Sequence, residues 1–331
     1  MPIKTTILGS GAMGTACALL LSQHDDQRAA IWGHNHGHID SIRQTRCNER
    51  LLPDIAIPDE IEVTSDIHEA VADADFLVAT IPSKHLRESL TKLAPSIPAN
   101  IPVVSVVKGI EVDTFYRPSQ IIRETIGDRP VIALSGPSHA EEIALKLPAS
   151  VVAACEDLEL AKTVQHMFST DRFRIYSNQD LVGVELAGAI KNIVGIAAGI
   201  SDGLGYGDNA KAALLTRAIV EMSRFGESQG ADPNTFPGLA GVGDVITTCC
   251  SPHGRNRRVG MRLGLGESLE EIMNTMEQVA EGVTTCRAVH QRALAQRIDM
   301  PITAEVHAVL FEGKSAAAAT DSLMSRPYKQ E

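Results

Sequence analysis

Short apolar runs alternate with longer helical stretches over the first half of the chain. The runs are rich in β-branched residues and lie at residues 4–8, 29–32, 76–81, 103–107, 131–134 and 150–154. Runs without a regular polar face are typical of parallel strands that are buried on both sides. Between the first two runs, residues 11–23 have a helical pattern. This alternation predicts a doubly wound α/β domain.

The pattern changes near Tyr176, where strand signals nearly vanish and helical periodicity takes over. Residues 182–201 form a long apolar stretch, and apolar side chains recur every three or four positions within residues 210–229. Further helices are expected at residues 269–276, 284–295 and 303–311. We therefore predict a Rossmann-type domain over residues 1–185, followed by an all-α domain over residues 186–331.

Length and charge narrow the class of protein. A chain of 331 residues is longer than one hydrophobic core usually serves, which agrees with two domains. The formal net charge of -11 argues against a nucleic-acid-binding face, but a local basic cluster would still suffice for a small phosphorylated substrate. We find no signal peptide and no apolar run that we interpret as a membrane span.

The cysteines and histidines give no sign of a metal site. The six cysteines are scattered and form no C-x-x-C pair, which argues against a zinc site and against a disulfide framework. Scattered thiols suit a reducing compartment, so we expect a cytoplasmic protein. His36 and His38 form an H-x-H pattern that is too small to hold a metal by itself, and we expect none.

A glycine motif follows the first predicted strand directly. Gly9, Gly11 and Gly14 form a G-x-G-x-x-G between this strand and a helix of small residues. In that position the first glycine permits a tight turn, and the second lets the backbone approach a pyrophosphate. The third lets helix and strand pack closely, while the helix N-terminus faces the anion. The motif predicts a dinucleotide site.

The second strand ends without the acidic residue that NAD-specific sites usually place there. Its end reads Ile31-Trp32-Gly33-His34-Asn35, so His34 and Asn35 are candidates to contact the ribose or a 2′-phosphate. Arg43 and Arg46 lie in the next helix. Because a carboxylate would repel a 2′-phosphate, its absence leads us to expect NADP, or dual use of NADP and NAD.

Lys191 is the leading candidate for proton transfer. No tyrosine has a lysine four residues further on, so the Tyr-x-x-x-Lys pair of short-chain dehydrogenases is missing, and so is a zinc-type Cys/His set. Lys191 lies in an almost wholly apolar helix, where desolvation disfavours the charged amine. Pairing with Glu185 is the structural alternative.

Two further segments lie at the carboxyl ends of predicted strands, where open α/β sheets bind ligands. Lys108 follows the strand at residues 103–107. The run Ser135-Gly136-Pro137-Ser138-His139-Ala140 ends the next strand. Its backbone and hydroxyl donors are candidates to meet a substrate or a nicotinamide, although a surface lysine and an ordinary turn are the alternatives.

The second half contains a basic cluster and a lone carboxylate. Gly254-Arg255-Asn256-Arg257-Arg258 is the densest basic run of the chain, and arginine forks bind phosphate oxygens in pairs. Arg257 and Arg258 also fit a merely solvated face. Asp244 follows a glycine-rich loop and could bind a substrate hydroxyl, orient Lys191 or cap a helix.

Taken together, these motifs resemble the bacterial-type NAD(P)-dependent glycerol-3-phosphate dehydrogenases. The resemblance extends from Ile7 to about Gly313 and includes, besides the segments above, Val279-Ala280-Glu281-Gly282. It implies an N-terminal Rossmann-type sheet with an all-α C-terminal domain, as in 6-phosphogluconate-dehydrogenase-like folds. It also implies interconversion of sn-glycerol 3-phosphate and dihydroxyacetone phosphate, which would supply phospholipid synthesis.

The resemblance implies roles for individual residues. The catalytic residues would be Lys191, Lys108 and Asp244. The cofactor contacts would be Gly9, Gly11, Ala12, Met13, Gly14, His34, Lys108, Ala140, Arg255, Val279 and Glu281. The substrate contacts would be Lys108, Gly136, Ser138, Lys191, Asp244, Gly254, Arg255 and Asn256. Two positions depart from the family: Met13 stands where an aromatic residue is common, and Gly254 replaces the usual serine.

Two other functions fit the same pattern. A β-hydroxyacid or ketopantoate-type reductase shares the two-domain plan and also has a lysine on the first long helix of its second domain. A cofactor-binding sensor without activity would not need Lys108, Lys191 and Asp244 together. The Arg-Asn-Arg-Arg cluster favours a phosphorylated substrate. The apolar helical half is compatible with a homodimer.

Overall fold

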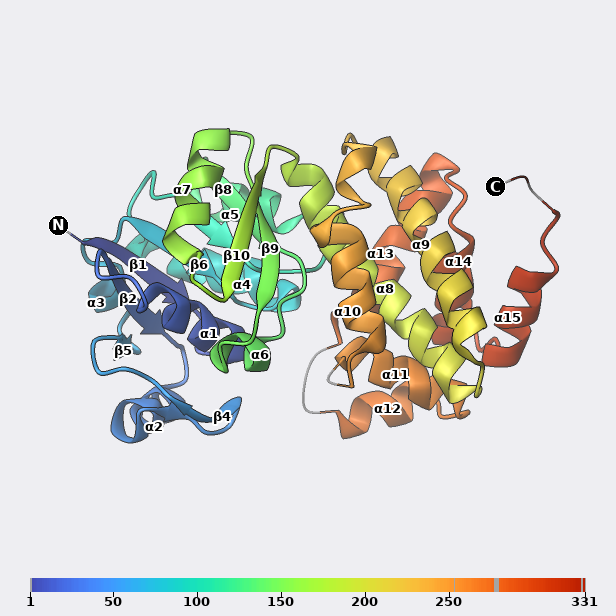
Figure 1. The fold of residues 1–331 in the computed structure, drawn as a ribbon, viewed down its shortest axis with the longest axis horizontal. Coiled ribbons are helices and arrows are strands. Elements are labelled where there is room, and N and C mark those ends of the chain that lie inside the picture. Colours follow the sequence, from blue (N-terminus) through green and yellow to red (C-terminus); the bar gives the residue numbers. More distant parts are fainter. Residues whose placement is uncertain (1, 253, 277–279, 329, 331) are drawn as a thin grey trace. The chain divides into compact units, whose positions relative to one another are not determined.

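The chain divides into two compact units (Figure 1). The computed structural model describes residues 2–252, 254–276, 280–328 and 330. The first unit comprises Met1–Lys108 and Arg117–Leu181, and the second comprises Gly109–Tyr116 and Val182–Glu331. The segment Gly109–Tyr116 thus interrupts the first unit and belongs with the helices. In Figure 1 the first unit contains the large sheet, whereas the second is built of helices.

An eight-stranded sheet forms the centre of the first unit, in the order β10-β9-β8-β7-β6-β1-β2-β5. The strands are β1 (Ile3–Leu8), β2 (Gln27–Trp32), β5 (Glu62–Thr64), β6 (Phe76–Ala79), β7 (Val103–Ser105), β8 (Val131–Ser135), β9 (Ala149–Ala154) and β10 (Phe173–Asn178). From β5 to β8 all neighbours are parallel. The strand order reverses between β1 and β6, which is the switch point where such sheets bind ligands. The predicted fold class is therefore confirmed.

The far edge of the sheet departs from the prediction. β9 runs antiparallel to β8, and β10 runs parallel to β9. The short β5 and the edge strand β10 were not predicted. In β10 buried and exposed residues alternate at first, which is typical of a strand with one wet face and unlike the fully apolar runs elsewhere.

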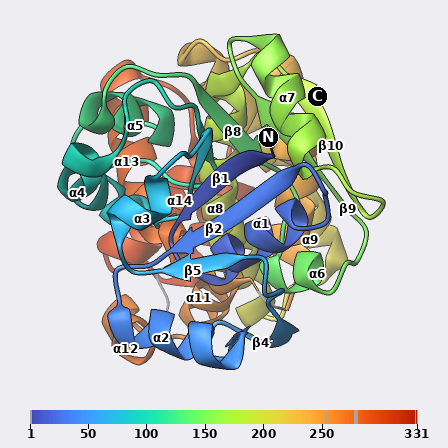
Figure 2. The same ribbon diagram turned by 90° about the vertical axis from the view of Figure 1, so that its left-hand side faces the viewer.

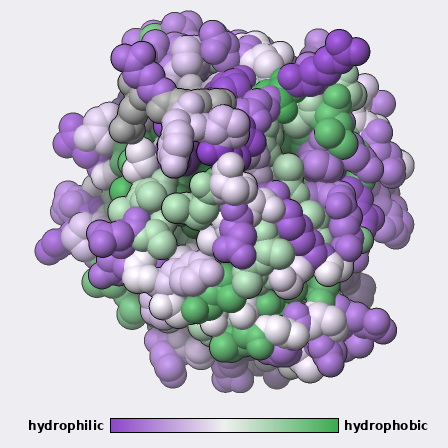
Figure 3. All heavy atoms as spheres, turned by 90° about the vertical axis from the view of Figure 1, so that its right-hand side faces the viewer, coloured by the Kyte–Doolittle hydropathy of each residue, from purple (hydrophilic) through white to green (hydrophobic). Residues whose placement is uncertain are grey.

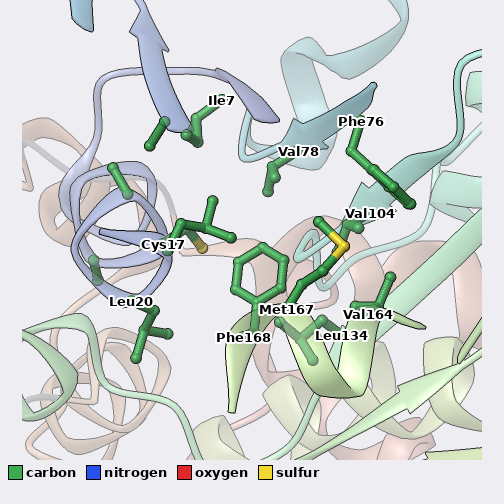
Figure 4. Packing of buried hydrophobic residues seen from close by; sticks show 14 of the residues in the cluster. Ile7, Cys17, Leu20, Phe76, Val78, Val104, Leu134, Val164, Met167 and Phe168 are labelled. Atoms are coloured by element: carbon green, nitrogen blue, oxygen red, sulfur yellow. The ribbon is translucent and has the colours of Figure 1, made fainter. Parts of the chain in front are cut away.

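Helices cover both faces of this sheet, as Figure 2 shows. One layer consists of α1 (Ala12–Leu21), α6 (Ala140–Ala144) and α7 (Leu158–Phe168), in which α1 packs on both α6 and α7. The other contains α3 (Ile67–Val71), α4 (Ser83–Leu93) and α5 (Pro118–Ile126). Figure 4 shows Phe168 and Met167 of α7 facing Val78 and Val104 of the sheet, all within one buried cluster. This core holds the sheet rigidly beneath its loops.

A small hairpin is inserted between β2 and β5. After α2 (His36–Thr45), Arg46 adopts a left-handed conformation and the chain forms the antiparallel pair β3 (Cys47–Asn48) and β4 (Leu52–Ala56). Leu52 is buried, and β4 packs against α6. The hairpin thereby anchors Asn48 as a fully buried amide in the first unit.

The second unit is organised around the long helix α8 (Leu181–Gly203). By length and composition this helix could cross a membrane, which the sequence interpretation overlooked, but 94% of its apolar window is buried inside the structure. That burial is typical of the core helix of a globular unit. The other helices are α9 (Asp208–Ser228), α10 (Asp244–Cys250), α11 (Arg255–Gly264), α12 (Leu269–Thr275), α13 (Glu281–Gln296), α14 (Pro301–Phe311) and α15 (Ala316–Met324). Of these, α10, α11 and α15 were not predicted.

Glycines let α8 and α11 approach backbone to backbone. A Cβ at Gly199 of α8 would lie 2.0 Å from the carbonyl oxygen of Arg257, and one at Gly260 of α11 would lie 2.0 Å from that of Ile196. Gly203 and Gly264 meet in the same way one turn further on. This close crossing fixes where α11 begins relative to α8.

The face of the helical unit drawn in Figure 3 mixes hydrophilic and hydrophobic residues. Large exposed apolar side chains of this unit include Leu265, Leu294 and Met324. The expected homodimer stays a prediction.

Candidate functional site

The glycine loop at the end of β1 has the shape that a dinucleotide requires. Gly9 has a φ of +131°, and its N–H donates to the carbonyl of Trp32 at 2.9 Å. A Cβ at Gly14 would lie 2.1 Å from the carbonyl oxygen of Gly9, so only glycine permits this packing. A Cβ at Gly11, in contrast, would meet no described atom within 4 Å. The space beside Gly11 is therefore open to a ligand, and the residues present fit a pyrophosphate at the N-terminus of α1.

Side chains hold the carbonyl groups of this loop from beneath. Thr80, directly after β6, donates its hydroxyl to the carbonyls of Leu8 and Gly9 at 3.1 and 3.2 Å. Asn48 donates to the carbonyl of Ser10 at 3.0 Å and to the hydroxyl of Thr15 at 2.9 Å. None of the side chains of Thr80, Asn48 and Thr15 belongs to a motif that the sequence marks as a candidate site. Only Thr80 had a signal, since it ends a strand next to the switch point.

Ala12 and Met13 lie at the start of α1. Both are partly exposed in the first turn, as the predicted contact with a cofactor needs. Ala140 begins α6 and is buried.

At the end of β2 most polar side chains already have protein partners. Asn35 caps α2 by accepting from the N–H of His38. Arg43 donates to the carbonyl of Val63, and Arg46 donates to the carbonyls of Ile57 and Ile61. His34 is exposed. The two arginines therefore serve the fold, and the exposed His34 stays a candidate to contact the ribose.

Lys108, Gly136 and Ser138 come together in the first unit. The Lys108 ammonium donates to the carbonyl of Gly136 at 2.8 Å and contacts the hydroxyl of Ser138 at 3.1 Å. Gly136 has a φ of +134° and its Cβ would lie 3.1 Å from the Cα of Val151. The sequence placed all three at carboxyl ends of adjacent strands, and the structure assembles them into one cluster.

Lys191 lies in the middle of α8 within a polar cluster of the helical unit. It is 9% exposed, and its amine lies 3.1 Å from a carboxylate oxygen of Asp244, which is itself 2% exposed. The amine also donates to the hydroxyl of Thr248 at 2.6 Å. Asp244 is thus the carboxylate partner of Lys191. It does not cap α10, since Gly243 occupies the N-cap position of that helix.

A π-helical turn places Asp244 at this position. It spans Leu239–Gly243, directly before α10. Within it, a Cβ at Gly241 would lie 1.9 Å from the carbonyl oxygen of Phe236, so the turn depends on glycine. Such π turns are frequent at functional sites. Thr248 follows Asp244 by four residues and therefore shares its helix face, a signal that the sequence interpretation did not use.

Asn256 connects three helices beside this cluster. Its amide donates to the side-chain oxygen of Asn192 at 2.9 Å, and its oxygen accepts the N–H of Gly282 at 3.0 Å. Asn192 is the neighbour of Lys191 on α8, and Gly282 lies in the first turn of α13. The start of α11 is thereby tied to the helix that carries the lysine.

The basic run divides into two roles. Arg257 forms an ion pair with Asp202 at 2.7 Å, which binds α11 to α8. Arg255 is exposed in the first turn of α11, where helix N–H groups and an arginine together can hold an anion. A Cβ at Gly254, the N-cap, would lie 2.9 Å from the carbonyl of Thr248. A serine there would require a local shift of the backbone.

The resemblance also implies cofactor contacts for Glu281 and Val279. Glu281 begins α13, next to the Gly282 that binds Asn256. Val279 lies outside the described residues.

Cysteine takes no part in the cluster. Burial raises the pKa of the Cys249 thiol, which neighbours Thr248, to about 12, although the charge of Lys191 opposes the shift. Such a thiol stays protonated and unreactive at neutral pH. Four of the six cysteines are small buried residues of the core, whereas Cys47 and Cys250 are not buried.

Known proteins match the chain over nearly its whole length. Residues 4–161 match the family model described as NAD-dependent glycerol-3-phosphate dehydrogenase N-terminus, and residues 180–321 match the corresponding C-terminus. The chain is 46% identical to glycerol-3-phosphate dehydrogenase [NAD(P)+] of Bacillus pumilus, over 99% of this chain and 96% of the relative. The enzyme of the same name from Listeria innocua is 45% identical over 99% of this chain and 98% of the relative.

A solved structure agrees with these sequence matches. The crystal structure of glycerol-3-phosphate dehydrogenase from Coxiella burnetii superposes with a TM-score of 0.93 at 34% identity, covering 98% of this chain and 99% of that one. Both units therefore have their counterparts in one known architecture, and the chain belongs to the NAD-dependent glycerol-3-phosphate dehydrogenase family.

Proposed function

We propose that the chain reduces dihydroxyacetone phosphate to sn-glycerol 3-phosphate, and catalyses the reverse oxidation, with Lys191 as the proton-transferring residue. The observation that carries this proposal is the buried Lys191–Asp244–Thr248 cluster in a chain of this family. The product would supply phospholipid synthesis. A ketopantoate-type or other hydroxyacid reductase is not favoured, because the relatives at 45–46% identity are named for glycerol 3-phosphate.

The cofactor is NAD or NADP, bound at the glycine loop. Gly11 and the first turn of α1 would hold its pyrophosphate, and Ala12 and Met13 would lie along it. When bound, it supplies or accepts the hydride. Because no carboxylate follows β2 and neither Arg43 nor Arg46 is available, we propose that the enzyme uses both forms.

The substrate phosphate would bind at the start of α11. Arg255 is exposed there, and the N–H groups of a helix's first turn point along the axis toward an anion. Asn256 fixes this turn by its bonds to Asn192 and Gly282. An anchored phosphate leaves the central carbonyl of the substrate free to meet the lysine.

Among the described residues the Lys191 ammonium has two partners, Asp244 and Thr248, which would leave one donor for the reacting oxygen. An ammonium group has three N–H donors, and two point to Asp244 and Thr248. The third would donate to the carbonyl oxygen of dihydroxyacetone phosphate, stabilise the negative charge that develops there and then transfer the proton. In the oxidation the neutral amine would accept the proton of the hydroxyl. Asp244 orients the amine throughout.

Lys108 would act by charge and by position. Its bonds to Gly136 and Ser138 fix the ammonium at the carboxyl ends of β7 and β8, where we propose that it contacts cofactor and substrate. We further propose a cytoplasmic homodimer. Light scattering of the purified protein tests the dimer, and a mass of one 35.4 kDa chain would exclude it.

A substrate panel tests the proposed function. Oxidation of NADPH and of NADH would be followed by absorbance with dihydroxyacetone phosphate, dihydroxyacetone, ketopantoate and a β-keto acid. We expect turnover with dihydroxyacetone phosphate for both cofactors and a large loss for unphosphorylated dihydroxyacetone. Turnover of a keto acid without turnover of dihydroxyacetone phosphate would overturn the proposal.

A further inference from the structure

The hairpin β3–β4 brings a buried amide to the glycine loop from far along the chain. Asn48 is fully buried and stands 38 residues from Ser10. Its amide nitrogen lies 3.0 Å from the carbonyl oxygen of Ser10 and 2.9 Å from the hydroxyl of Thr15. An amide nitrogen carries two hydrogens, so it can donate to both at once.

The hydroxyl of Thr15 connects Asn48 to the carbonyl of Gly11 through a second hydrogen bond. Its hydroxyl oxygen lies 3.2 Å from the carbonyl oxygen of Gly11, and Thr15 itself is fully buried. The hydroxyl accepts from Asn48 and donates to Gly11. Asn48 thus contacts the carbonyl of Ser10 directly, which the ring nitrogen of His38 also approaches at 3.3 Å, and reaches the carbonyl of Gly11 through Thr15, whose backbone N–H donates to that carbonyl as well at 2.9 Å.

The direction of a carbonyl decides the direction of the following N–H. In a planar trans peptide, the C=O of one residue and the N–H of the next point to opposite sides. Holding the carbonyls of Ser10 and Gly11 toward the protein therefore turns the N–H groups of Gly11 and Ala12 away from it. The position that a Cβ of Gly11 would occupy is also open, with no described atom beyond its chain neighbours within 4 Å.

We infer that Asn48 is a positioning residue for the cofactor, which presets the N–H groups of Gly11 and Ala12 as donors to the pyrophosphate. Thr80 does the same work for the first half of the loop through Leu8 and Gly9. A loop that is fixed before binding loses less conformational freedom when the cofactor arrives. The inference rests on the cofactor position proposed above.

The test measures cofactor affinity directly. Trp32 is the single tryptophan of the chain and ends β2, and its carbonyl accepts the N–H of Gly9. Its fluorescence quenching by NADH, by NADPH and by ADP-ribose gives Kd for each. In Asn48→Ala we expect Kd to rise about tenfold for all three probes, because the pyrophosphate is common to them. At saturating cofactor, kcat and the KM for dihydroxyacetone phosphate should stay within about twofold.

Two conservative substitutions of Thr15 separate an effect on cofactor positioning from an effect on folding. They test the inference even if Asn48→Ala does not fold. Thr15→Val keeps the shape and removes the hydroxyl, so Kd should rise, whereas Thr15→Ser keeps the hydroxyl and should bind nearly as well as the parent. Gln165→Ala is the matched control, because that amide also holds a backbone carbonyl, that of Ile175, but lies in α7 away from the loop. Its Kd should not change.

Two results would overturn the inference. One is a Kd within twofold of the parent value in both Asn48→Ala and Thr15→Val. The other is an equal rise of Kd in Gln165→Ala, which would assign the effect to general loosening of the unit. A parent protein that bound neither NADH nor NADPH would instead refute the cofactor position itself.

Discussion

Substituting Gly199 by alanine tests how the close crossing of α8 and α11 positions the site. The added Cβ would lie 2.0 Å from the carbonyl oxygen of Arg257 and 2.8 Å from the nitrogen of Met261, whereas ordinary contact begins at 3.4 Å. Both neighbours are backbone atoms, so no side chain can rotate away. The two helices must separate by about 1.4 Å at this point.

Gly199→Ala should lower both the free energy of unfolding and kcat/KM for dihydroxyacetone phosphate. Overpacking of this kind costs about 1–3 kcal/mol, and the better helix propensity of alanine recovers about 1 kcal/mol. We expect the free energy of unfolding to decrease by about 0–2 kcal/mol in urea titrations. Because Arg257 follows Arg255 and Asn256 in the same helix, a displacement near 1 Å should lower kcat/KM for dihydroxyacetone phosphate by about 100-fold.

Gly37→Ala is the matched control. Gly37 lies in the first turn of α2, where a Cβ would meet only the side chain of Asn35 at an ordinary 3.6 Å. This variant should keep parental activity and lose no stability. Parental stability and parental kcat/KM in Gly199→Ala would refute the reasoning that a glycine contact sets the position of α11.

Three further predictions concern other groups of the helical unit. Glu221 is buried and accepts hydrogen bonds from the N–H groups of Ile302 and Thr303 at the start of α14. The variant Glu221→Ala should therefore lower the free energy of unfolding by about 3 kcal/mol, while kcat at 25 °C stays near the parent value. An unchanged urea midpoint would contradict this prediction. The pKa of His290 is lowered by desolvation and by stacked His307, although Glu312 opposes the shift. Because the unfolded chain then binds the proton more readily, the stability present above pH 6.5 should be lost as the pH falls from 6.5 toward the pKa of the folded state. The variant His290→Phe should lose less stability over the same range. Equal slopes of stability against pH in the two proteins would contradict this prediction. Asp244→Asn removes the charge that orients Lys191, so kcat should fall at least tenfold with an unchanged Kd for NADPH, and a parental kcat would exclude that role.

Much of the first unit could be predicted because its strands are buried on both faces. The runs that become β1, β6, β7 and β8 are apolar or β-branched for the same reason that they form the centre of the sheet. β5 was too short to stand out, and the alternation in β10 resembles a surface segment. The reversal of β9 depends on its pairing with β8, which no local pattern encodes.

The candidate site was predictable only where one segment carries the chemistry. The glycine motif and the lysine within an apolar helix were visible because their neighbours in sequence are also their neighbours in space. Asn48 was not, since its importance comes from its contacts with Ser10 in the loop and Thr15 in α1, which lie 38 and 33 positions away. Arg257 was ambiguous in sequence, and its partner Asp202 lies 55 residues away on α8.

The most direct test of the central role of Lys191 is the turnover of Lys191→Ala with dihydroxyacetone phosphate and NADPH, measured with and without added methylamine. We expect kcat to fall by about two orders of magnitude or more, with Kd for NADPH within about twofold of the parent value. Methylamine should restore part of the rate in proportion to its concentration, because it replaces the missing proton donor. Near-parental turnover without added amine would show that another group transfers the proton.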